Sequence, residues 1–322
     1  MSLKDVRGQE SALDILKRSE RNSRLAHAYL FLGPKGCGKK RAALEFSKFL
    51  NCEDKKDDAC DKCSSCIKID KLAHPDLFVV ERDEKATQIS ISQIRRIKER
   101  LSLKPFEARY NIALIMDAHY MNDESFNSLL KILEEPGQDT LFILTASNQR
   151  SLPETIVSRC QIIKFRPLTK KEVENHLKDE LSLDSEEAGI LSSVSGGNLE
   201  YALRLKSEDM LSFKNSLIDE IVLNNGFYKQ DQSLLLGLKR EDQKEALNLL
   251  LGFYRDLIIY KVTRDDNLII NIDRIQDIAK LSESVSIEKA QKYISIVEKI
   301  REAISINVNS KLAIRTLQAN LT

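Results

Sequence analysis

The segment that most constrains the fold is a glycine-rich loop between a strand-like run and a helix-like run. Residues 28–32 read AYLFL, residues 33–40 read GPKGCGKK, and an amphipathic run begins near Arg41. Glycines let backbone N–H groups turn inward around phosphate oxygens, and the start of the following helix adds partial positive charge. The segment therefore predicts a phosphate-binding loop, with the candidate residues Gly33, Gly36, Gly38, Lys39 and Lys40.

This loop departs from a working nucleotide site at its last position. A Ser or Thr hydroxyl there helps to hold Mg²⁺, but the residue is Lys40, whose ammonium cannot ligate a metal ion. The apolar run 112–115 is followed by Met116 and Asp117, so one of the two acids expected for nucleotide hydrolysis is missing. Either Met116 occupies the metal-binding place, where a thioether is a poor ligand, or Asp117 takes that place itself. We expect that ATP and Mg²⁺ are not bound productively.

Short apolar runs alternate with longer amphipathic stretches through the first half of the chain. This pattern is typical of parallel strands joined by crossover helices, and branched or aromatic residues suit strands that are buried on both faces. We predict an α/β domain with a parallel five-stranded sheet, formed by the runs 28–32, 77–80, 110–116, 140–146 and 161–165.

Strand-like runs stop after residue 166, and the rest of the sequence has helical period. Thr169 and Glu172 have the spacing of a capping box that opens a helix, and residues 195–198 form a turn signal. Apolar stripes after about residue 209 indicate the core of a helical bundle. We expect an α/β domain over 1–166, a small helical domain over 167–208 and an all-α domain over 209–322.

Composition excludes several classes of protein. Hydrophobic residues make up 42% of the 322 residues and charged residues 31%, which excludes general disorder. The net charge is +1, so any contact with nucleic acid has to come from local basic clusters such as residues 95–100. No run approaches the roughly 18 apolar residues of a membrane span, and no signal-peptide core follows Met1. We expect a cytoplasmic protein without membrane contact.

Four of the six cysteines lie in one short segment, with the spacing C-x7-C-x2-C-x2-C. Four thiolates gathered by tight turns make a closed tetrahedral zinc site of the structural kind. An iron–sulfur cluster is the alternative, but the Cys-Pro that follows in such clusters is missing. We predict a structural zinc module at about 52–66, and we assign Cys37 and Cys160 to local packing. Its ligands are Cys52, Cys60, Cys63 and Cys66.

Several further motifs together resemble the bacterial clamp-loader branch of the AAA+ ATPases. The resemblance extends over essentially the whole chain and implies an AAA+ P-loop domain, a helical lid domain and an all-α collar domain that holds a ring of subunits together. It also supports the zinc module. The motifs are VRGQ at 6–9, LAHAYLFLG at 25–33, NSLLK at 127–131, LEEP at 133–136, SRC at 158–160 and NVNSKL at 307–312.

The family contains ATP-hydrolysing gamma/tau subunits and a delta-prime type that lacks a working ATPase site. Lys40, Met116 and Glu200 each replace a residue that the hydrolysing relatives use, and a carboxylate at Glu200 would repel a terminal phosphate. The resemblance to the delta-prime type implies an accessory subunit of the DNA polymerase III holoenzyme without ATPase or polymerase activity of its own. An active gamma/tau-like ATPase that uses Lys39 and Asp117 is the alternative, and a generic DNA-binding module is a third possibility.

The resemblance gives Arg159 a role in a neighbouring subunit. In the family, the Arg of the SRC motif is offered across a subunit boundary to the nucleotide of the next ATPase. A planar guanidinium pairs with phosphate oxygens and stabilises charge that develops during phosphoryl transfer. We expect Arg159 to act as an arginine finger in trans within a hetero-oligomer. The implied partners are the gamma/tau and delta subunits, with the sliding clamp and primed DNA reached through the complex.

Overall fold

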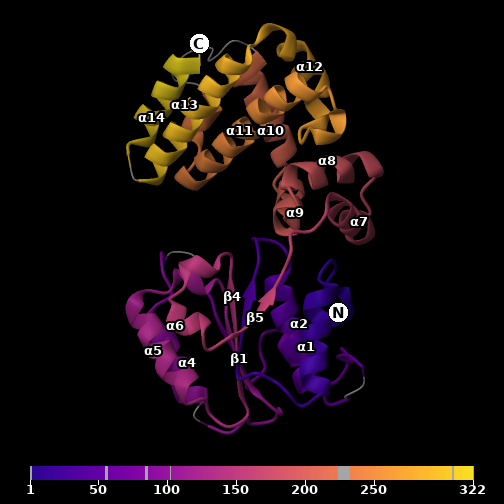
Figure 1. Ribbon diagram of the computed structural model, residues 1–322, viewed down its shortest axis with the longest axis vertical. Helices are drawn as coiled ribbons and strands as arrows, with labels where there is room; N and C mark the ends of the chain where they lie inside the picture. The colour runs from indigo at the N-terminus through magenta and orange to yellow at the C-terminus, as the bar shows by residue number, and fades with distance from the viewer. Residues whose placement is uncertain are drawn as a thin grey trace. The chain divides into compact units, whose positions relative to one another are not determined.

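The computed structural model describes residues 2–54, 57–83, 86–101, 103–223, 233–306 and 308–321. Asn307, the first residue of the motif near the end of the chain, lies outside them. The chain divides into two compact units, which are described separately (Figure 1). The first comprises Met1–Glu172 with Asn198–Glu200, and the second comprises Val173–Gly197 with Tyr201–Thr322.

The first unit is built on a parallel five-stranded sheet with the strand order β2-β3-β4-β1-β5. Every neighbouring pair of strands is parallel, which confirms the predicted α/β sheet. All residues of β1, β3 and β4 are buried, because helices cover both faces of these strands, and this explains their nearly continuous apolar sequence. The strands are β1 (Ala28–Leu32), β2 (Leu77–Val80), β3 (Asn111–Ile115), β4 (Thr140–Ala146) and β5 (Gln161–Lys164).

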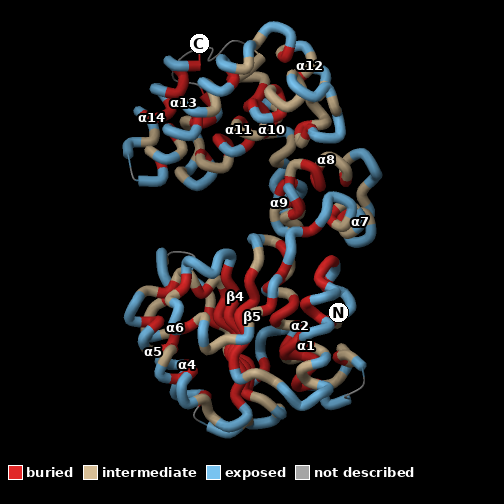
Figure 2. Tube along the Cα trace, in the orientation of Figure 1, coloured by how far each residue is buried: buried red, intermediate tan, exposed pale blue. Residues whose placement is uncertain are grey.

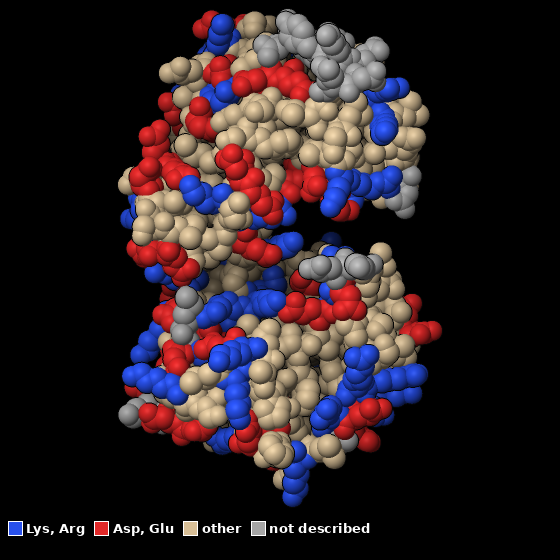
Figure 3. Space-filling model, turned by 180° about the vertical axis from the view of Figure 1, so that it is seen from behind, with Lys and Arg blue, Asp and Glu red and all other residues tan. Residues whose placement is uncertain are grey.

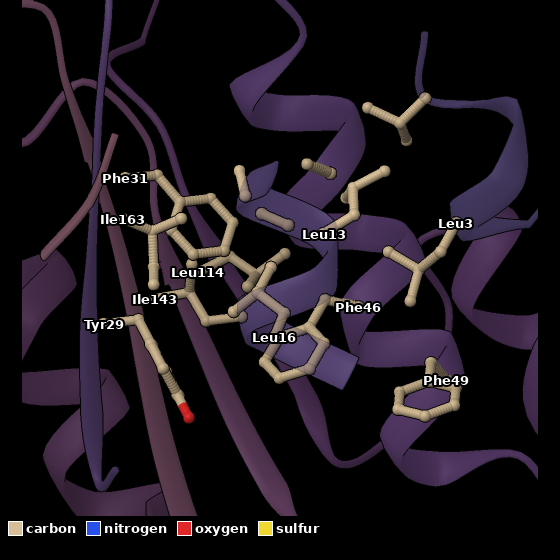
Figure 4. Packing of buried hydrophobic residues seen from close by; sticks show 14 of the residues in the cluster. Leu3, Leu13, Leu16, Tyr29, Phe31, Phe46, Phe49, Leu114, Ile143 and Ile163 are labelled. Carbon is tan, nitrogen blue, oxygen red and sulfur yellow. The ribbon is translucent and has the colours of Figure 1, made fainter. Parts of the chain in front are cut away.

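Helices cover the two faces of the sheet in two groups (Figure 1). On one face, Leu16 and Phe46 pack with Tyr29 and Phe31 of β1, and Figure 4 shows this cluster at close range. Residues that alternate with these along β1, such as Leu30, pack against the helices of the other face. The first group contains α1 (Glu10–Arg21) and α2 (Lys39–Asn51), and the second contains α4 (Ile91–Leu101), α5 (Asp123–Glu134) and α6 (Glu154–Val157).

The described residues of the second unit form helices and connections without a strand. Its main core joins Leu250 and Leu257 of α11 to Val297 and Ile304 of α13 and to Ile314 of α14. Figure 2 shows buried residues along the inward sides of these helices. The all-α part is thereby confirmed, whereas its division at residue 208 stays a prediction. The second unit contains most of α7 (Lys170–Leu181) and of α9 (Leu199–Ser207), whose first residues belong to the first unit, and it contains all of α8 (Ser185–Ser195), α10 (Met210–Ile218), α11 (Arg240–Thr263), α12 (Ile275–Ser284), α13 (Ile287–Ser305) and α14 (Ser310–Leu321).

In the part of the chain that the structure describes, no helix combines the length and the apolar character that a membrane span needs.

Candidate functional site

The glycine-rich loop connects β1 to α2, and its close approach to β5 explains its first glycine. A Cβ atom at Gly33 would come within 2.4 Å of the Phe165 carbonyl oxygen, so no larger residue fits without movement of the backbone. Gly38 has a φ of 95°, which places it in the left-handed region that favours glycine. The glycines therefore allow the sharp connection from the sheet into α2.

Lys39 turns its side chain back onto the loop. The Lys39 Nζ donates hydrogen bonds of 2.7 Å to the carbonyl oxygens of both Gly33 and Pro34, and 7% of the residue is exposed. A bound phosphate would have to compete with these two carbonyl acceptors for the ammonium. Carbonyl groups of the loop itself thus accept hydrogen bonds from the Lys39 ammonium.

Lys40 stands where a hydroxyl would help to hold magnesium. Its Nζ lies 2.6 Å from Glu81 Oε1, just beyond the end of β2. The neighbouring Met116 is 5% exposed, and the backbone N–H of Asp117 donates to Thr145 Oγ1 at 2.8 Å. An ammonium and a thioether are poor partners for an ion that prefers carboxylate, carbonyl and water oxygens, so these residues do not fit Mg²⁺.

Gln9 joins the N-terminal segment to the loop, and sequence reasoning missed this role. Its Nε2 donates to the carbonyl oxygens of Cys37 and Arg166 at 3.0 and 2.8 Å, and its Oε1 accepts from the Arg166 N–H at 3.1 Å. Gln9 is 3% exposed, so water does not replace these bonds readily. Its position in the VRGQ motif is the signal that could have drawn attention to it.

Residues Asn198–Glu200 belong to the first unit, although the sequence prediction places them in the lid. The Leu199 N–H donates to the Gly36 carbonyl oxygen at 3.2 Å, so the start of α9 contacts the glycine-rich loop. Glu200 is exposed in the first turn of this helix. The structure therefore places the loop and the segment of Glu200 within one unit, while the effect of Glu200 on a phosphate stays a prediction.

Arg159 lies between α6 and β5 and is held by two acceptors. Its Nη1 donates to the Thr155 carbonyl oxygen at 2.9 Å, and its Nη2 lies 2.8 Å from Glu134 Oε1. Glu134 is the last residue of α5, where the helix dipole also favours a cation. The side chains of Arg159 and Glu134 are 34% and 52% exposed, so this ion pair contributes at most about 1 kcal/mol. The pair between Arg159 and Glu134 can therefore be broken at small cost.

The neighbouring Cys160 has no sign of a reactive thiol. Burial raises the pKa of the Cys160 thiol to about 12, so it stays protonated at neutral pH. It packs at the edge of the core cluster that contains Leu30 and Ile156. This agrees with the packing role that we predict for Cys160.

The four predicted zinc ligands come together in the structure. The sulfur atoms of Cys52, Cys60, Cys63 and Cys66 all lie within 4.8 Å of one another. Four sulfurs at about 2.3 Å from a tetrahedral zinc ion are separated by about 3.8 Å, so small shifts would complete the site. All four thiols are free of disulfide bonds. The donor set therefore fits zinc.

Backbone N–H groups point at the sulfur atoms of this site. The N–H groups of Cys60, Cys63 and Cys66 donate to the sulfur atoms of Cys52, Cys60 and Cys63 at 3.3–3.4 Å. Backbone hydrogen bonds from Lys62 and Cys63 lower the pKa of the Cys60 thiol to about 7. Such bonds favour the thiolate form that binds metal.

Basic side chains are mixed with acidic ones on the surface. Figure 3 shows Lys and Arg interspersed with Asp and Glu on the face in view, which agrees with a net charge of +1. The predicted basic cluster contributes Arg95 and Lys98 to a pocket of about 630 Å³ between α4 and α5, which also contains Glu99, Glu124 and Lys131. This pocket carries charges of both signs and favours no single charged ligand.

Comparison with known proteins gives the family of the chain. The family model described as DNA polymerase III, delta subunit, matches residues 8–169, and the model for the C-terminal part of that subunit matches residues 209–319. The delta' subunit of DNA polymerase III from Bacillus subtilis is 30% identical over 308 residues, which are 94% of this chain and 92% of the relative.

The tau subunit from the same organism is 28% identical over 92% of this chain, and the match spans 57% of the relative. Among solved structures, a gamma subunit-related protein from Thermotoga maritima shares 17% identity, with 95% of this chain and 98% of that chain covered and a TM-score of 0.47. Both family models and the delta' relative lead to one conclusion: the chain belongs to the DNA polymerase III delta subunit family.

Proposed function

We propose that this chain is a non-hydrolysing clamp-loader subunit of the delta-prime type. It helps to load the sliding clamp onto primed DNA and supplies Arg159 to a neighbouring gamma/tau ATPase. The observation that carries the proposal is the pair formed by Lys40 and Glu81, which puts an ammonium where a hydrolysing subunit needs a magnesium ligand. The similarity to delta' and tau subunits supports the choice of partners.

Two further features of the structure support the absence of hydrolysis. Lys39 is engaged by the carbonyl oxygens of Gly33 and Pro34, and Met116 presents a buried thioether next to Asp117. Hydrolysis needs a metal ion that neutralises the developing charge on the phosphates. Because Lys40 and Met116 supply no oxygen ligand for that ion, the loop connects β1 to α2 and leaves the chemistry to another subunit.

Arg159 suits a role outside its own chain. One third of its side chain is exposed, and the weak pair with Glu134 keeps the guanidinium near the ends of α5 and α6. A triphosphate carries more charge than one carboxylate and accepts two parallel hydrogen bonds from a guanidinium. Arg159 therefore exchanges Glu134 for the phosphate of a neighbour when the subunits assemble.

Zinc at the four-cysteine site is structural in this proposal. Cys52, Cys60, Cys63 and Cys66 supply four sulfur ligands, which leave no open position for a reacting water molecule. When bound, the ion closes the loop that follows α2 and fixes its conformation. The subunit works in the cytoplasm as part of a hetero-oligomer with gamma/tau and delta subunits.

The alternative function is an active ATPase of the gamma/tau type. The persistence of Lys39 in an intact glycine-rich loop, with Asp117 at the end of β3, favours it. ATP turnover by the isolated chain separates the two functions. Turnover that Lys39→Ala abolishes would establish the alternative, whereas the proposal expects no turnover above background from either protein.

The role of Arg159 is tested in a loader reconstituted with gamma/tau and delta subunits, the clamp and primed DNA. We expect Arg159→Ala to fold normally and to slow ATP hydrolysis at the neighbouring site by about 10³-fold or more. Arg150→Ala is the matched control, because Arg150 is an exposed arginine in the nearby turn Gln149–Ser151. An unchanged rate with saturating Arg159→Ala subunit refutes the assignment.

A further inference from the structure

Lys48 is a buried lysine that the proposed function does not use. Its side chain is 0% exposed near the C-terminal end of α2, and its Nζ contacts three carboxylates. Glu45 lies at 3.1 Å, both oxygens of Asp70 lie at 3.0 Å, and Asp61 completes the set. Burial alone disfavours the ammonium, but hydrogen bonds to Asp61, Asp70 and Glu45 outweigh it and raise the pKa of Lys48.

The partners of Lys48 lie on different parts of the four-cysteine segment. Asp61 stands in the loop between the second and the third cysteine, and Asp70 ends α3 (Ser64–Asp70), the helix that carries the fourth. Lys48 itself precedes the first ligand, Cys52, by one helical turn. One buried ammonium thus contacts both later ligand-bearing stretches and stands on the helix that leads into the first.

We propose that Lys48 is the positioning residue of the four-cysteine site. It holds the loop and α3 against α2, so that the four sulfur atoms stand close together before a metal ion arrives. The inference rests on the zinc assignment in the proposed function and deepens it. A group that orients metal ligands without touching the metal typically changes metal affinity by about 10- to 100-fold when it is removed.

A contribution to the stability of the fold is a weak explanation for the clustering of Lys48 with three carboxylates. Buried ion pairs cost much desolvation energy, and apolar residues of similar volume often replace them without loss of stability. Catalysis by the Lys48 amine is also excluded, because three carboxylates keep the ammonium charged. Placement of metal ligands explains why the charged partners lie in the loop and at the end of α3.

The test measures zinc affinity of the full chain by competition with a chromogenic chelator. We expect Lys48→Met, which keeps the length of the side chain without its charge, to bind zinc about 10- to 100-fold more weakly than the wild type. The absorption of bound Co²⁺ should also lose the intensity typical of tetrahedral thiolate ligands. Lys68→Met is the matched control, because Lys68 lies on α3 but pairs with Glu107 on the surface. Its affinity should be unchanged.

A merely stabilising role would lower the unfolding temperature of Lys48→Met and leave its zinc affinity and Co²⁺ spectrum unchanged, which overturns the inference. Asp70→Asn, at a position 40% exposed, is the second variant if Lys48→Met does not fold, and we expect it to weaken zinc binding in the same direction. Normal zinc affinity in Asp70→Asn would then overturn the inference. A wild-type chain that binds no zinc overturns the metal assignment itself, whatever the variants do.

Discussion

The ion pair between Arg166 and Glu172 makes the stability of the first unit depend on pH. The two guanidinium nitrogens donate to the two carboxylate oxygens at 2.8 and 2.6 Å. These hydrogen bonds, together with those from Thr169, lower the pKa of Glu172 from 4.5 to about 2. Because the pKa is lower in the folded state, the pair stabilises fully above pH 4.5 and loses its effect as pH falls toward 2.

The magnitude follows from the two pKa values. A carboxyl that shifts from 4.5 to about 2 on folding would contribute about 3.4 kcal/mol at neutral pH. The Arg166 side chain is 47% exposed, so solvent screening reduces this contribution to about 1–2 kcal/mol. Linkage then requires more than half of the contribution to disappear between about pH 7 and pH 3.

Urea unfolding of the full chain, followed through the transition of the first unit, measures this contribution. The difference in unfolding free energy between the wild type and Glu172→Gln should be about 1–2 kcal/mol at pH 7 and shrink as the solution is acidified. Glu10→Gln is the control, because Glu10 lies 3.9 Å from the same guanidinium with 78% of its side chain exposed. A difference that stays constant between pH 7 and pH 3 would refute the reasoning.

Three further predictions concern anchors in the first unit. Gln9→Ala should lower the free energy of unfolding by about 2–4 kcal/mol, because three buried hydrogen bonds are lost, and a loss below about 1 kcal/mol in urea would contradict this. Asp76→Ala removes the acceptor of the N–H groups of Phe106, Glu107 and Ala108, so chymotrypsin should cleave after Phe106 faster than in the wild type. Removal of the proposed zinc by a chelator should speed hydrogen exchange at residues 57–66 and leave β1 protected, since Cys52, Ala59 and Cys66 form a cluster separate from the core that contains Tyr29 and Phe31; exchange that rises equally in both would contradict this.

Local chemistry could be predicted from the sequence with good detail. The capping box is an example: the Glu172 N–H donates to Thr169 Oγ1 at 3.2 Å, and the Thr169 N–H donates to Glu172 Oε2 at 2.8 Å. The apolar runs likewise correspond to the five strands, because burial on both faces leaves a clear pattern. The cysteine spacing also predicts the cluster, since tight turns bring neighbouring ligands together.

Contacts between residues that are far apart in the sequence left no such pattern in the local sequence. Gln9 bonds to Arg166 across 157 positions, and nothing in the local sequence of either residue indicates the other. The same holds for Lys48, which reads as one more charged position on an amphipathic helix although it is completely buried. The pair of Arg159 with Glu134 joins the ends of two helices that become neighbours only on the folded sheet.

The glycine-rich loop has a packing role that does not depend on nucleotide chemistry. Gly33 lies too close to the Phe165 carbonyl for any side chain, and the Cys37 carbonyl accepts a hydrogen bond from Gln9. The loop therefore packs between β1, β5 and the N-terminal segment. This close packing requires a glycine at position 33 whether or not phosphate binds. The last loop position carries no such demand, because Lys40 is half exposed and pairs with Glu81 on the surface. Packing thus explains the glycine at position 33 whether or not a nucleotide binds, whereas packing does not explain the residue at position 40.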